Sequence, residues 1–178
     1  QPCWSARSVE AVEVNGYTIE PGANLRGANL EGANLSKANL TGAYLGGVNL
    51  TGADLTGVRL SNASLEGVNL TGADLTGADL TGVRLSNISL EGAVFSGACL
   101  RGADLSPETP HGLPNRRGGH PQKLPVTVFV DFSGVDLRGA DFTGADISGM
   151  NGFKGAFADE NTTWPEGFDP VAAGVIFD

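Results

Sequence analysis

The stretch ANLRGANLEGANLSKANLTG (23–42) repeats the unit Ala-Asn-Leu-X-Gly four times, with one departure at Lys37. From Leu25 to Leu105 a large apolar residue recurs at every fifth position, seventeen times in succession. A period of five matches neither the 3.6 residues of a helical turn nor the 2.0 of a strand. The chain must therefore bury these side chains by alternating short straight runs with corners.

We label the large apolar residue of each unit i. Position i−2 is Ala in twelve of the seventeen units, and position i+2 is Gly in thirteen. Gly is the residue best suited to a corner that needs a positive φ, and Asn is the next best. Lys37 occupies i+2 and does not fit this geometry, so we expect a different turn type there. Four corners close a coil of twenty residues, and stacked coils pair like strands, ~4.8 Å apart.

This pattern resembles that of the pentapeptide-repeat family, A(D/N)LXX. The resemblance covers seventeen units in 23–107 and four more in 130–149. It implies an all-β fold, a right-handed quadrilateral β-helix of about five coils, with one inserted loop and non-repeat caps. The tail at 159–170 is similar to that of many cyanobacterial members, so the resemblance also suggests a cyanobacterial source.

Breaks in the period divide the chain into five parts. We expect an N-terminal arm or cap at 1–22 with a strand at 12–19, the β-helix at 23–106, and a Pro-rich insertion loop with a return strand at 107–130. The last β-helix coil follows at 131–149, and a C-terminal cap at 150–178. Asp169 and Pro170 are expected to start a short helix in that cap. The aromatic residues expected to cover the open end of the β-helix are Phe153, Phe157, Trp164 and Phe168. With both ends capped, the protein is expected to be a monomer.

The formal net charge of −9 is distributed unevenly. Residues 1–22 and 23–106 each carry −2, residues 107–130 carry +2, and residues 131–178 carry −7. Members of the family bind DNA gyrase as acidic mimics of duplex DNA, which has one negative charge per ~1.7 Å of axis. Because the long repeat region is nearly neutral, a DNA-mimicking regulator of a type II topoisomerase is the disfavoured alternative. A nucleic acid is not an expected partner either.

Four acidic residues at successive i−1 positions of the last coil, one per face, form what we call the acidic rim: Asp131, Asp136, Asp141 and Asp146. Asn or Asp at this position can accept hydrogen bonds from the turn backbone, so a solvated rim is the simplest interpretation. A divalent-cation site is the alternative, but side chains on four faces cannot converge on one ion. We therefore predict no metal site.

The sequence contains two cysteines, Cys3 in the N-terminal arm and Cys99 at an i−1 position, where its sulfur is expected to point outward. At ~3.3 Å per extended residue the arm can run far enough along the outside of the β-helix to meet Cys99. In an oxidising compartment such a pair is expected to be bridged. Closing a loop of about 95 residues would contribute about 4 kcal/mol. Two unrelated thiols remain the alternative.

The Pro-rich insertion is the one part of the sequence with a net positive charge, +2. A basic tip could contact an anionic partner or a membrane surface, and simple solubility of a loop explains it equally well. Two histidines without neighbouring Cys or carboxylate ligands make a poor metal site. The candidate interaction residues of this loop are His111, Arg116, Arg117, His120 and Lys123.

Neither a catalytic constellation nor a cofactor motif occurs in the sequence. It contains no nucleophile–base pair and no phosphate-cradling loop, and a core filled by Leu and Ala leaves no substrate pocket. We therefore predict neither catalytic nor cofactor-binding residues. The expected function is that of a rigid scaffold for an unidentified protein partner.

The first residue is Gln1, which indicates either a removed signal peptide or a trimmed sequence. The first interpretation predicts export to the periplasm or the thylakoid lumen. No apolar run approaches the ~18 residues of a membrane span, so we expect no transmembrane segment.

Overall fold

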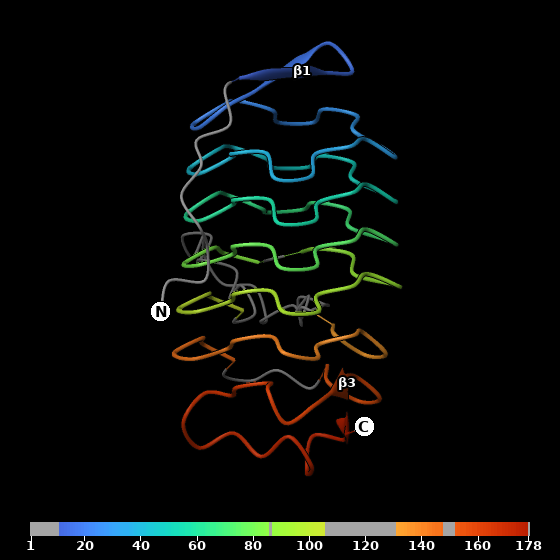
Figure 1. Ribbon diagram of the computed structural model, residues 1–178, viewed down its shortest axis with the longest axis vertical. Coiled ribbons are helices and arrows are strands. Elements are labelled where there is room, and N and C mark those ends of the chain that lie inside the picture. Colours follow the sequence, from blue (N-terminus) through green and yellow to red (C-terminus); the bar gives the residue numbers. More distant parts are fainter. Residues whose placement is uncertain (1–10, 86, 106–130, 148–151, 178) are drawn as a thin grey trace, which may run out of the picture.

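The computed structural model describes residues 11–85, 87–105, 131–147 and 152–177. The chain winds into coils stacked along one axis, with an N-terminal hairpin at one end and the C-terminal strands at the other (Figure 1). The named strands are short: β1 (Val12–Val14), β2 (Tyr17–Ile19), β3 (Phe157–Ala158) and β4 (Ile176–Phe177). The described ranges hold no helix with the length and apolar character needed to cross a membrane.

Parallel pairing with a register of twenty residues holds the coils together. Asn24 pairs with Tyr44, and Tyr44 pairs with Ser64 one coil further on. Backbone hydrogen bonds accompany each pairing, such as Leu25 N to Tyr44 O and Tyr44 N to Ala23 O, both 2.9 Å. Successive units therefore occupy four faces in turn, as the sequence period predicted for a quadrilateral β-helix.

The residues at i and i−2 fill the interior of the coils. From Leu25 to Leu105 every residue at i is at most 3% exposed, and the Ala, Val and Ile residues at i−2 from Ala28 to Ala103 are also buried. Burying one Leu side chain contributes roughly 1.5–3 kcal/mol, so the repeated column of leucines is the main source of stability.

From Gly22 to Gly102, each described corner is a turn whose third residue has a positive φ. Gly27 has a φ of 67°, and Lys37 has a φ of 59°, in the same left-handed region. The corner at Lys37 also has the usual hydrogen bond, from Ala38 N to Leu35 O at 3.0 Å. The prediction of a different turn type at Lys37 was therefore wrong. The geometry of the coil imposes the turn, and the lysine adopts it at an energetic cost.

Replacing Lys37 by Gly is expected to stabilise the protein by ~0.5–1 kcal/mol. A left-handed conformation costs a non-glycine residue ~1–2 kcal/mol, and the greater entropy that glycine loses on folding offsets part of the gain. The midpoint of denaturant unfolding measures the change. Asn62→Gly is the matched control, because Asn62 has a φ of 57° and asparagine tolerates this region. An unchanged or lowered midpoint for Lys37→Gly would show that the lysine makes a compensating interaction.

The register of the ladder, the stack of paired coils, changes on its C-terminal side, where Asp136 pairs with Phe157 and Asp141 pairs with Thr163 at spacings of 21 and 22 residues. The largest change comes before these pairs. Val94 pairs with Asp136 and Cys99 pairs with Asp141, so that the spacing is 42 residues instead of 20. The chain therefore contains 22 additional residues at this point, and after them the i−1 positions of the repeat pair again with i−1 positions of the preceding coil. The predicted loop and return strand at 107–130 lie outside the described residues.

The N-terminal end is a hairpin, not the single strand predicted for 12–19. β1 and β2 pair antiparallel, and Asn15 and Gly16 form the turn with φ values of 53° and 82°. Positive φ at both positions is the requirement of the commonest two-residue hairpin turn, for which Asn-Gly is the preferred sequence. The dipeptide Asn15–Gly16 is thus a sequence signal for a hairpin, which the prediction of a single strand at 12–19 did not take into account. Ile19 is buried in the core, so the hairpin packs on the first coil.

Aromatic rings fill the C-terminal end of the core. The rings of Phe132 and Phe153 are nearly parallel with centroids 5.5 Å apart, and Trp164 stacks on Phe142 at 5.2 Å. Neighbouring rings contact one another through the whole cluster, which consists of Phe95, Phe132, Phe142, Phe153, Trp164 and Phe168.

Phe157 does not join this aromatic cluster, contrary to the prediction. It lies in β3 and is 39% exposed, whereas Ala156 and Ala158 on either side are buried. Ala158 follows Phe153 by five residues, so the segment continues the repeat with a small residue at i. The period itself therefore places Phe157 at i−1, on the outside.

Asp169 and Pro170 begin a single turn and not the predicted short helix. Ala172 N donates to Asp169 Oδ1 at 3.0 Å, as it would to an N-cap. The turn ends at Gly174, whose φ of 81° directs the chain into β4. Only Val175 then lies between Gly174 and β4, so a second helical turn has no room.

Candidate functional site

The outward side chains at i−1 hold the corners together. Asn34 accepts a hydrogen bond from Ser36 N at 3.0 Å, and Asp54 accepts one from Thr56 N at 3.0 Å. The backbone hydrogen bond from Thr56 lowers the pKa of Asp54, since it favours the charged form. One oxygen of each of these side chains therefore binds the backbone of its own turn. Most of the outward side chains of the ladder are uncharged.

The ladder does not present a continuous line of acid. In one column Asp54 and Asp74 are neighbours, but the column starts at Asn34 and continues to Val94. Coils are ~4.8 Å apart, so even a column with an acid in every coil would carry fewer charges per length than duplex DNA.

Two carboxylates of the acidic rim bind side chains as well as the turn backbone, and Asp74 and Asp104 of the ladder also bind side chains. Arg138 donates to Asp136 through Nε at 2.9 Å and through Nη2 at 2.7 Å. Asp141 accepts a hydrogen bond from Thr163 Oγ1 at 2.7 Å and lies 3.8 Å from Arg101 Nε. The local hydrogen bonds expected of the rim are present as well, for example from Ser133 N to Asp131 at 2.8 Å.

These hydrogen bonds lower the pKa values of two of the rim carboxylates, Asp136 and Asp141. The side-chain hydrogen bond of Arg138 lowers the pKa of Asp136 to about 2. Burial raises the pKa of Asp141, but the hydrogen bonds of Thr143 and Thr163 oppose it, and the net shift is downward. Asp131 and Asp146 are exposed to solvent. The described residues contain no group of three or more His, Cys, Asp or Glu arranged to hold a metal ion.

Replacing Arg138 by Met removes the ion pair with Asp136 and is expected to destabilise the protein at neutral pH by up to about 1 kcal/mol. The effect is no larger because the side chains of Arg138 and Asp136 are both partly solvated. The pKa of Asp136 is lowered in the folded state, so the contribution is present above pH ~4 and is lost as the pH falls toward 2. Thermal melts at pH 7, 4 and 2 measure this. The difference in melting temperature between the variant and the wild type should become smaller as the pH falls. A difference that stayed constant would show that Arg138 does not stabilise the protein through the charge of Asp136. Lys154→Met, which removes a cation elsewhere in the same region, is the control.

The C-terminal end also carries exposed apolar side chains. Phe157 and Ile176 are paired in β3 and β4, and they are 39% and 46% exposed. Phe177 follows at 45%, and Val171 in the preceding turn is 72% exposed. Within the described residues β4 pairs only with β3, so its outer edge is open. We call these four residues the C-terminal apolar surface.

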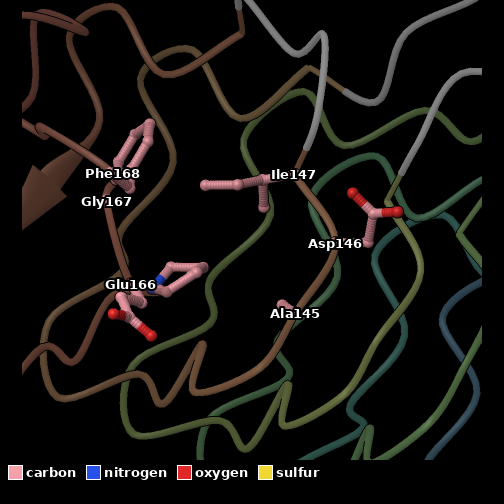
Figure 2. A pocket seen from close by; sticks show the side chains of 7 residues that line it. Ala145, Asp146, Ile147, Glu166, Gly167 and Phe168 are labelled. Carbon is pink, nitrogen blue, oxygen red and sulfur yellow. The ribbon is translucent and has the colours of Figure 1, made fainter.

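A shallow cavity of about 300 Å³ lies at the same end (Figure 2). The side chain of Ile147 extends toward the segment that carries Glu166 and Phe168, whereas the side chain of Asp146 points away from that segment. The residues that line this cavity include no nucleophile paired with a base, so the lining does not indicate a catalytic reaction. Its lining consists of Ala145, Asp146, Ile147, Pro165, Glu166, Gly167 and Phe168.

Of the other predicted site residues, Cys99 pairs with Asp141 of the acidic rim, and the rest lie outside the described residues. Cys99 occupies an outward position but is only 2% exposed, with its sulfur 3.4 Å from Thr81 Oγ1. Its predicted partner Cys3 lies outside the described residues, and the disulfide between them stays a prediction. The loop residues outside the described ranges are His111, Arg116, Arg117, His120 and Lys123.

The chain belongs to the pentapeptide-repeat family. The family profile described as "Pentapeptide repeats" matches it in 8 copies, over residues 22–52, 33–72, 49–87, 69–106 and 129–151. These ranges cover more than half of the chain, and they include both parts of the ladder on either side of the change of register.

Solved pentapeptide repeat proteins resemble the chain at moderate similarity. One from Nostoc PCC 7120 is 25% identical with a TM-score of 0.42, and the match covers 90% of this chain and 85% of that one. One from the thylakoid lumen of Arabidopsis thaliana is 31% identical with a TM-score of 0.41, covering 53% and 68%. QnrB1, a plasmid-mediated fluoroquinolone resistance protein, is 17% identical with a TM-score of 0.35, covering 92% and 67%. A search of curated proteins gave no significant match. The family assignment therefore rests on the family profile.

Proposed function

We propose that this protein is a non-enzymatic, rigid scaffold that binds a protein partner at its C-terminal end. The observation that carries the proposal is the coincidence of exposed apolar side chains with the acidic part of the chain. Phe157, Val171, Ile176 and Phe177 are exposed within a region whose net charge is −7. Apolar surface rimmed by polar residues is typical of protein interaction sites.

The chemistry of this end defines the partner. The apolar surface requires an apolar patch on the partner, and the ionised rim favours positive charge around that patch. Asp136 and Asp141 are charged at neutral pH, and hydrogen bonds lower their pKa values further, which extends the charge to more acidic solution. A basic protein surface with an apolar centre is therefore the expected match, and its binding should weaken with added salt.

The test is affinity capture from an extract of the source organism with matched variants. The double variant Phe157→Ser/Ile176→Ser alters only exposed side chains, so the fold should be retained. We expect it to lose a partner that the wild-type protein retains. Tyr44→Ser is the control, because Tyr44 is 50% exposed on the ladder and pairs with Asn24 of the first coil, away from the C-terminal end.

Two outcomes would overturn this assignment. Retention of the partner by the double variant, or its loss in Tyr44→Ser, would move the binding site to the ladder. Light scattering separates a hetero-partner from self-association, because we propose a monomer of 18.2 kDa. A mass of twice that value for the wild type, and of one chain for the double variant, would make the surface a dimer contact.

The second candidate, a DNA-mimicking regulator of a type II topoisomerase, is disfavoured by the nearly neutral ladder. A supercoiling assay with gyrase separates the two functions. We expect no inhibition at micromolar protein, and inhibition would favour the alternative. Export to the periplasm or thylakoid lumen of a cyanobacterium belongs to the same proposal, and fractionation of the source cells tests it.

A further inference from the structure

One face of the ladder ends in β4, and the same two backbone hydrogen bonds join each strand of this face to the next. Leu137 N donates to Phe157 O at 2.7 Å, and Phe157 N donates to Val135 O at 2.9 Å. One step further on, Phe157 pairs in parallel with Ile176, and Ile176 N donates to Ala156 O at 2.8 Å. The pattern of the coils therefore continues as far as β4.

The backbone of β4 offers the next pair of these bonds. A strand added beyond β4 would accept a hydrogen bond from Phe177 N and donate one to Val175 O, which are the groups equivalent to Leu137 N and Val135 O. Among the described residues, neither group takes part in a backbone hydrogen bond. Since Ile176 directs its own backbone groups toward β3, those of its two neighbours face the open edge. Such an edge is a template for pairing with another chain.

The side chains at this edge define the sequence of the added strand. Ile176 follows Phe157 in the outward column and is 46% exposed. Phe177 pairs with the buried Ala158 in the inward column, yet it is 45% exposed. An added parallel strand would place one residue over Ile176 and the next over Phe177, so two consecutive apolar side chains fit. Residues 152–177 contain one lysine and four acidic residues, which favour basic flanks in the added strand.

We propose that the partner binds through an extended segment that pairs in parallel with β4, with two consecutive apolar residues between basic flanks. This inference rests on the proposed function, which places the partner at the same surface. In this mode of recognition the backbone hydrogen bonds provide affinity, and the side chains provide specificity. A second copy of this chain is the less suitable occupant, because it would bring a second acidic end to the same edge.

A labelled synthetic peptide, Lys-Arg-Thr-Val-Ile-Val-Thr-Arg-Lys, tests strand addition to the full chain by fluorescence polarisation. Phe177→Ala and Phe177→Pro are the matched variants, because both remove the ring but only proline removes the N–H donor. Proline is tolerated on an edge strand where its nitrogen faces solvent, so both variants should fold, which circular dichroism checks. We expect Phe177→Pro to bind the peptide about tenfold more weakly than Phe177→Ala. A peptide with Ser at the three central positions should not bind the wild type.

Equal affinity of Phe177→Ala and Phe177→Pro for the peptide would overturn the inference, and so would the absence of peptide binding to the wild type. The captured partner separates this inference from the proposed function. Its loss in Phe157→Ser/Ile176→Ser, with equal binding to the two variants of Phe177, would overturn strand addition alone. Its retention by the double variant would overturn the proposed function. A mass of two chains for the wild type, and of one chain for Phe177→Pro, would assign the edge to a second copy and overturn the inference.

Discussion

Leu65→Asp is expected to abolish folding at room temperature. Leu65 is fully buried in the column of leucines. Losing a Leu side chain from a core costs about 2–5 kcal/mol, and a buried carboxylate without a partner adds several kcal/mol more. The sum is comparable to the whole stability of an ordinary domain, about 5–15 kcal/mol. Circular dichroism and denaturant unfolding of the purified variant measure the effect.

Ser64→Asp is the control for this variant, because it introduces the same group one residue earlier. Position i−1 is outward, and Asp occupies it in several other units. We expect a change within about 0.5 kcal/mol. Equal destabilisation by the two substitutions would contradict the assignment of inward and outward positions.

Phe132→Ala is expected to destabilise the protein by about 3–5 kcal/mol, because it leaves a cavity in the aromatic cluster. Phe132 is fully buried and contacts the rings of Phe95, Phe142 and Phe153. Near-ultraviolet circular dichroism should lose part of its signal, since these rings pack in fixed orientations. Denaturant unfolding gives the free-energy change.

Phe157→Ala is the matched control for the cluster. The same side chain is removed, but from an exposed position in β3, and the expected change is within about 1 kcal/mol. A loss of stability as large as that of Phe132→Ala would mean that Phe157 packs in the end of the core, as first predicted from its position in the tail.

The interior of the β-helix could be predicted from the sequence because one physical rule acts on every unit. The five-residue spacing determines which side chains point inward, and the burial from Leu25 to Leu105 follows it throughout. The same rule, applied five residues beyond Phe153, would have placed Phe157 outside. The error there came from treating the tail as non-repetitive.

The turns were predicted less well, because residue preference and imposed geometry can disagree. Lysine disfavours a positive φ, yet Lys37 adopts it because the coils above and below determine the path of the chain. The hairpin at Asn15–Gly16 shows the opposite case, in which the local signal was sufficient and was not used.

The candidate site was predicted only in part. The concentration of acid after residue 131 is visible in the sequence, whereas the exposure of Ile176 and Phe177 depends on where the last strand pairs. The burial of Asp79 and Cys99 has no signal in the repeat, which places both outward.

We propose that the C-terminal end binds the partner and that the ladder supports this end. The most direct test is the dissociation constant of the captured partner for wild-type protein, for Phe157→Ser/Ile176→Ser and for Tyr44→Ser. Loss of two central apolar contacts is expected to weaken binding tenfold or more, which is about 1.4 kcal/mol or more. We predict this for the double variant and an unchanged constant for Tyr44→Ser. The reverse order would contradict the account.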